Sequence, residues 1–260
     1  MVAVTLDDGL LKPNRVAKVT LDFWFVTLLV GTIGGTVADD LSFRLGFGIS
    51  AAAWIMGTLL IMALVLQFHQ SRYVPWVYWT TVLLISVVAA LVSDEFAENL
   101  GTPLETVAAF FAIALMMSFA LWSLWEETLS IHSIITTRRE VFYWFAIFFA
   151  FAFATAAGDL IAEKLGFGYL ETVVLFAILA GLFWLAYRLK LNSTFCFWSA
   201  YLLTHPLGNA FGNLLARHRS DGGLGLGTTA TGLIFIACVI LTVVYMTWSH
   251  DGEEFATESN

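Results

Sequence analysis

The chain has 260 residues, of which 59% are hydrophobic and only 12% are charged, and its formal net charge is −8. Ordinary soluble domains carry about 25% charged residues, so a soluble fold could not bury this much apolar surface. The composition therefore predicts a polytopic membrane protein that has the lipid bilayer as its partner. The excess of acidic residues argues against binding to nucleic acid, which requires a basic surface.

Eight apolar runs are long enough to cross a membrane, whose core of about 30 Å requires roughly 20 helical residues. In chain order they are 19–45, 48–68, 74–100, 103–125, 141–165, 168–189, 194–216 and 225–248. The predicted fold class is an all-α polytopic membrane protein with eight transmembrane helices. We expect a single transmembrane domain over 1–260 that ends in an acidic cytoplasmic tail, 249–260.

Lysine and arginine residues indicate how the helices are oriented, because they favour the cytoplasmic side of a membrane. With the N-terminus inside the cell, eight of the 12 basic residues fall on cytoplasmic segments. These eight are Lys12, Arg15, Lys18, Arg72, Arg138, Arg139, Arg188 and Lys190. The distribution predicts a multi-pass protein of the cell membrane with both termini in the cytoplasm.

The eight predicted helices form four tandem units that share a fixed internal spacing. The units cover 18–70, 72–129, 138–192 and 193–248. An aromatic residue and a Trp open each unit, and 15 residues after each Trp stand, in order, Asp39, Asp94, Asp159 and Asn213. In the first three units a glycine that can end a helix follows 22 residues after the Trp, at Gly46, Gly101 and Gly166. Each unit crosses the membrane twice, so all four have the same orientation, and we expect a pseudo-fourfold or pseudo-twofold axis along the membrane normal.

The first helix of each unit carries mostly small or polar residues at positions 7, 11 and 15 after its Trp, and these positions share one helix face. The third unit contributes Thr155 to this stripe, and the fourth contributes His205 and Asn209. The second helix of each unit is bulky and apolar nearly all round, as is typical of helices that face lipid. We therefore expect the first helices to line an inner core, although a small-residue stripe also serves close packing alone.

Three carboxylates and an amide around one axis cannot all remain charged and unpaired inside a membrane, where an ionisable group marks a functional site. Protons or a bound cation would relieve the repulsion, and oxygen ligands suit hard cations such as Mg²⁺, Ca²⁺ or Mn²⁺. The predicted function is therefore a small-cation transporter or channel-like carrier for protons or divalent metal ions. The predicted ion or proton site consists of Asp39, Asp94, Asp159, Asn213, His205, Asn209 and Thr155. The three aspartates are the metal-ligand candidates, and no cofactor is expected other than a bound cation.

A non-transporting membrane scaffold or sensor is the alternative function. In that case the acids are structural, and we expect them to be paired with Arg44, Lys164 or backbone groups in a packed core. The sequence leaves open whether the protein works as a homodimer.

One polar loop, "LSIHSIITTRREVFYW", separates the two halves of the chain and is expected at the cytoplasmic side. Arg138 and Arg139 are suited to act there as positive-inside anchors. His132 beside Ser130 and Ser133 is a weak candidate for a membrane enzyme, because no nucleophile-elbow motif accompanies it. We therefore expect no enzymatic activity.

Several segments resemble an uncharacterised family of prokaryotic membrane proteins built from a short repeat of unknown function. The similar segments are the loop "TLSIHSI…TRRE.FYW", "TAAGD" in the third unit and "GGLGLGT" near the carboxyl terminus, and the resemblance covers roughly 18–248. Family members often carry Glu where this chain has Gly35, and Arg and Asp where it has His205 and Asn213. The resemblance implies an architecture of four two-helix repeats, and it leaves the function open because the family brings no established substrate.

Overall fold

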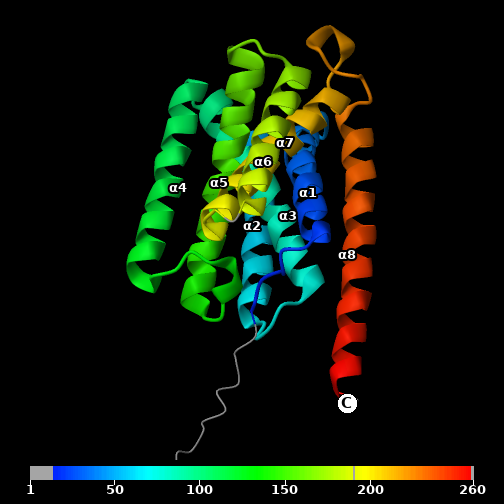
Figure 1. Ribbon diagram of the computed structural model, residues 1–260. Helices are drawn as coiled ribbons and strands as arrows, with labels where there is room; N and C mark the ends of the chain where they lie inside the picture. The colour runs from blue at the N-terminus through cyan, green and yellow to red at the C-terminus, as the bar shows by residue number, and fades with distance from the viewer. Residues whose placement is uncertain (1–13, 190, 259–260) are drawn as a thin grey trace, which may run out of the picture.

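The computed structural model describes residues 14–189 and 191–258, and this part of the chain folds into eight long helices (Figure 1). They are α1 (Leu21–Asp39), α2 (Ile49–His69), α3 (Pro75–Asp94), α4 (Leu104–Glu126), α5 (Thr137–Asp159), α6 (Tyr169–Arg188), α7 (Ser193–Ala216) and α8 (Thr228–Glu258). Among the described residues, seven of these helices are long and apolar enough to cross a membrane. The remaining helix, α7, carries His205, Asn209 and Asn213 within its span. The predicted all-α polytopic membrane fold is confirmed.

Short π-helical turns follow three of the helices, and each begins directly after a predicted site aspartate. The turns are η1 (Asp40–Arg44), η2 (Glu95–Asn99) and η4 (Leu160–Lys164). Just beyond them, Gly46, Gly101 and Gly166 have φ values of 74°, 64° and 70°, so these glycines end the helices as the sequence predicted. We call this side of the bundle the acidic end. The opposite side, where the Trp residues that open the four units lie, is the Trp end.

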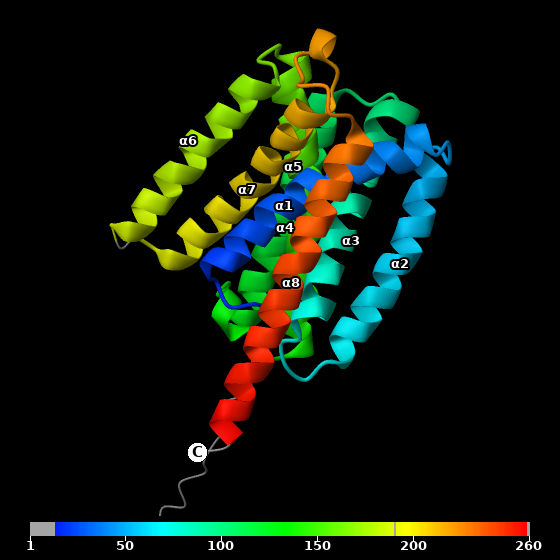
Figure 2. The ribbon, with the colours of Figure 1, turned by 90° about the vertical axis from the view of Figure 1, so that its right-hand side faces the viewer.

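The helices α1, α3, α5 and α7 form a closed inner ring, in which each contacts the next and α7 returns to α1. Each outer helix packs mainly on the inner helix of the following unit, so that α2 lies on α3, α4 on α5 and α6 on α7. The last outer helix, α8, lies along α1 and closes the circle (Figure 2). In the apolar part of α3, 72% of the residues are buried, against 17% in α6, which confirms the predicted division into inner and outer helices.

Glycines allow α1 and α7 to cross closely. A Cβ atom at Gly208 would lie 2.5 Å from the carbonyl oxygen of Leu28, and one at Gly31 would lie 2.9 Å from that of His205. Backbone atoms are the obstacle in both cases, so a side chain at either glycine would force the helices apart. The small residues at this crossing therefore serve packing, which was the simpler interpretation of the stripe.

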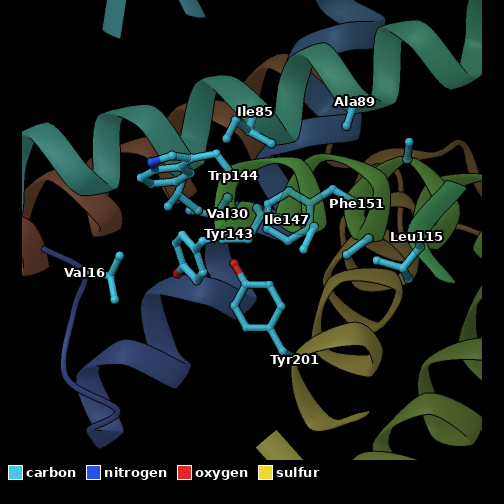
Figure 3. Close-up of a cluster of buried hydrophobic side chains, with 14 of the residues drawn as sticks. Val16, Val30, Ile85, Ala89, Leu115, Tyr143, Trp144, Ile147, Phe151 and Tyr201 are labelled. Atoms are coloured by element: carbon cyan, nitrogen blue, oxygen red, sulfur yellow. The ribbon is translucent and has the colours of Figure 1, made fainter. Parts of the chain in front are cut away.

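Large side chains fill the centre of the ring at the Trp end. Tyr143, Tyr201 and Phe151 are at most 1% exposed and lie between the inner helices (Figure 3). The hydroxyls of Tyr78 and Tyr143 are 2.5 Å apart, and the ring of Phe151 stacks on that of Tyr201. Side chains thus close the axis of the bundle on this side.

The segment before α1 crosses the Trp end and ties several turns together. The backbone N–H of Arg15 donates to the carbonyl of Ile134 at 3.0 Å, and that of Tyr73 donates to the carbonyl of Asn14 at 3.1 Å. The side chain of Arg15 also forms an ion pair of 3.1 Å with Glu140, which is fully buried. Both ends of the described chain lie on this side (Figure 1). The predicted tail from 249 continues as the last part of α8 up to Glu258.

Candidate functional site

The predicted aspartates sit at equivalent places in three units. Asp39, Asp94 and Asp159 are the last residues of α1, α3 and α5. Since positions four apart lie on the same helix face, each aspartate stands one turn beyond a residue of the small-residue stripe. The closed ring of inner helices turns these faces toward a common space.

A cavity of about 240 Å³ lies at the acidic end of the ring. Six of the seven residues predicted for the ion or proton site line it: Asp39, Asp94, Asp159, Asn213, Asn209 and Thr155. Two charged residues that the sequence analysis missed, Glu98 and Arg217, line it as well. Both stand 19 positions after their Trp, so they continue the four-residue spacing of the stripe by one more step. Extending the stripe by one more position would have identified both residues from the sequence.

Two of the aspartates have direct polar neighbours in the cavity. The Nη2 atom of Arg217 lies 3.3 Å from the Oδ2 atom of Asp39, and the side-chain amide of Asn209 donates to Asp159 at 3.4 Å. Asp94 lines the same space, and within the described part of the chain its carboxylate accepts no hydrogen bond. The fourth unit thus offers amides and a guanidinium where the others offer carboxylates.

Two uncharged polar side chains line the cavity without a partner. Asn213 is 7% exposed and Thr155 is 4% exposed. Among residues 14–189 and 191–258, neither side chain makes a hydrogen bond. Buried polar groups in proteins are nearly always hydrogen-bonded, so these two side chains are available to a bound molecule or to water.

His205 lies outside the cavity, although it belongs to the same stripe of α7. It is 1% exposed, and its imidazole stacks on the ring of Phe151 with 3.8 Å between centroids. His205 stands one helical turn closer to the Trp end than Asn209, where Phe151 fills the axis. The structure therefore brings together six of the predicted site residues and places His205 outside the cavity, on the side of the Trp end.

The carboxylates do not converge on one point. No group of three or more His, Cys, Asp or Glu residues in the described part of the chain lies close enough to hold a metal ion. The three aspartates instead occupy different walls of the cavity. Their role as metal ligands remains a prediction, without geometric support from this arrangement.

The scaffold alternative expected Arg44 and Lys164 to pair with the site aspartates, but both pair with other residues. Arg44 donates to the hydroxyl of Thr229, and Lys164 forms an ion pair with Glu105. Asp39 is instead paired with Arg217.

The polar loop between the two halves of the chain lies at the Trp end, away from the cavity. Arg138 and Arg139 both pair with Glu126 at the end of α4, and Arg139 Nε lies 2.7 Å from the Glu126 carboxylate. His132 lies in a short 3₁₀ turn, η3 (Ile131–Ser133), and its backbone N–H donates to the hydroxyl of Ser130 at 3.3 Å. The two arginines thus tie α4 to α5.

The comparisons with known proteins agree with this repeat structure. A family model described as Repeat of Unknown Function (DUF347) matches residues 77–128, 142–192 and 196–251. These matches correspond to the second, third and fourth units. The first unit lies outside them, although Trp24, Asp39 and Gly46 keep its spacing. Neither a curated protein nor a solved structure matches the chain.

Proposed function

Because the chain belongs to the DUF347 repeat family, whose function is unknown, we propose from the geometry of the acidic cavity that the protein is a small-cation carrier. The observation that carries the proposal is a cavity of about 240 Å³ whose walls hold one aspartate from each of three helices. An ionisable side chain inside a membrane costs several kcal/mol unless it is compensated, so such residues are rare away from ion or proton sites.

Packed side chains close the cavity toward the Trp end. Toward the Trp end, Phe151, His205 and Tyr201 fill the axis and are at most 1% exposed. A permanently open channel would need a continuous passage along this axis. A site that is reached from one side favours a carrier, in which the closed side opens in a second conformation.

The proposed orientation places both termini in the cytoplasm of the cell and the cavity toward the outside. Both ends of the described chain lie at the Trp end. Of the ten lysines and arginines in the described part of the chain, six fall on segments of that side, and the positive-inside rule favours such an excess at a cytoplasmic face.

The first experiment is thermal unfolding of the purified protein in detergent, titrated with a panel of cations and over a series of pH values. A cation at 100 times its Kd stabilises the protein by about 2.7 kcal/mol, which is readily seen. We expect one cation, or the proton, to raise the unfolding temperature of the wild type. Asp94→Asn and Asp159→Asn should lose this response.

Asp221→Asn is the matched control, because Asp221 is exposed at the acidic end and lies outside the cavity. It should respond like the wild type. A wild type that ignores every cation and pH change would contradict the proposal.

That outcome would favour the alternative function of a membrane scaffold or sensor. Two contacts support this alternative: the ion pair between Arg217 and Asp39, and the hydrogen bond from Asn209 to Asp159. Both give an acid a structural partner. In a scaffold, Asp159→Asn should lower the thermal stability whether or not a cation is present.

A further inference from the structure

We propose that the cavity recognises a small organic cation with several N–H donors, such as a guanidinium or primary ammonium compound. The guanidinium of Arg217 occupies part of the same site, so it competes with the ligand. The inference rests on the proposed carrier function and narrows its substrate class.

The distribution of the acids is the first argument. The cavity of about 240 Å³ has room for several water molecules, which is far more space than a bare metal ion fills. Because no three acidic side chains in the described chain converge, a single ion could not contact them all. A cation whose N–H groups are spread over several atoms reaches acceptors on more than one wall.

The uncharged wall residues are the second argument. Asn213 and Thr155 are more than nine-tenths buried, line the cavity, and have no hydrogen-bond partner among the described residues. An amide oxygen and a hydroxyl both accept hydrogen bonds from N–H groups. They supply directed acceptors beside the carboxylates, which suits a ligand with directed donors.

Arg217 is the third argument, because it already places a guanidinium in this space. Its Nη2 atom lies 3.3 Å from Asp39. Its backbone is fixed by the following loop, where the N–H of Gly225 donates to the Arg217 carbonyl at 2.9 Å. A Cβ atom at Gly223 would clash with the same carbonyl oxygen, so the loop packs tightly against it.

The Arg217 side chain remains displaceable although its backbone is held. It is 40% exposed, and ion pairs with that much access to water are weak. The lining contains four acidic side chains, Asp39, Asp94, Glu98 and Asp159, against the single guanidinium of Arg217. A cation that enters can therefore take over Asp39 while Arg217 turns outward.

The test is isothermal titration calorimetry on the full-length protein in detergent. The probes are guanidinium and methylammonium at low millimolar concentration, with Na⁺, Mg²⁺ and tetramethylammonium for comparison. Tetramethylammonium has the same charge and no N–H donor. We expect guanidinium and methylammonium to bind and tetramethylammonium not to bind.

Variants of the basic residues test the competition. Arg217→Gln should tighten binding of guanidinium by up to about fivefold, which corresponds to the loss of an exposed ion pair. Arg219→Gln is the matched control, because Arg219 is exposed on the same loop and outside the cavity lining. It should leave the affinity unchanged, whereas Asn213→Leu should weaken it.

The outcomes separate this inference from the carrier proposal. Binding of Mg²⁺ or a pH-dependent stabilisation, without binding of the N–H cations, overturns the inference and leaves the carrier function standing. Equal binding of tetramethylammonium overturns the role of the N–H donors. An unchanged affinity in Arg217→Gln overturns the competition. If no cation and no proton binds, both proposals fail.

Discussion

Glu140 is a carboxylate with no access to solvent, and its neighbours explain how the fold tolerates it. It is 0% exposed, and it accepts hydrogen bonds from Arg15 at 3.1 Å and from Gln67 at 2.8 Å. A buried charge without a partner is strongly destabilising, so these contacts hold the segment before α1 in place.

Arg15→Ala should therefore lower the free energy of unfolding by about 3 kcal/mol. This is the lower end of the range for breaking a buried pair, because Gln67 still donates to Glu140. Chemical or thermal unfolding in detergent measures the change. Lys18→Ala, an exposed neighbour, serves as the control and should be neutral.

The double variant Arg15→Ala with Glu140→Gln should recover part of the lost stability, because the uncompensated charge is gone. A double variant as unstable as the sum of both single changes would mean that the two residues act independently.

At the scale of single residues, the repeat spacing predicts most of the side chains that line the cavity, whereas their role as an ion or proton site stays a prediction. Asp39, Asp94 and Asp159 follow from one distance to a Trp, and the structure places all three on one cavity. Arg217 keeps the same four-residue spacing one step further, but it lies just beyond the end of α7, where a loop replaces the π turn of the other units, so its place in the cavity was not predicted. Glu140 was not predicted either, because nothing in its position reveals its burial.

The helices themselves meet through features that the sequence shows only in part. Gly208 and Gly31 lie where α1 and α7 cross, and both were visible as small residues in inner helices. The partners of the outer helices were not predictable. The surface of each outer helix is apolar nearly all round. No face of it therefore indicates whether it packs on the preceding or on the following inner helix.

Gly208→Ala should separate α1 from α7 and destabilise the protein by about 1–3 kcal/mol, because the new methyl group meets backbone atoms that cannot rotate away. Gly57→Ala on α2 is the matched control, since a Cβ atom there meets nothing within 4 Å. Its unfolding temperature should equal or slightly exceed that of the wild type. Equal tolerance of both substitutions would contradict the close crossing.

For the molecule as a whole, the circle of outer helices around the inner ring is completed by the contact of α8 with α1. A Cβ atom at Gly232 would lie 4.0 Å from the Cβ atom of Thr36, which is within the range of a disulfide. In a background without Cys196 and Cys238, the pair Thr36→Cys and Gly232→Cys should form an intramolecular disulfide. Mass spectrometry after alkylation, with and without reductant, detects it.

The pair Thr36→Cys and Gly57→Cys is the control and should remain reduced, because Gly57 is open to its surroundings. Disulfide-linked dimers in place of an internal bridge would mean that α8 packs on α1 of a neighbouring chain. The same experiment thus addresses the homodimer that the sequence left open.

The pairing of each outer helix with the next unit also sets the order in which the molecule is completed during translation. Of the eight helices, α1 reaches the membrane before the others, and the outer helices α2, α4 and α6 each arrive just before the inner helix that they cover. The outer neighbour of α1 is α8, which is synthesised after the other seven. The outward face of α1 must therefore wait beside lipid or an insertion factor until α8 leaves the ribosome.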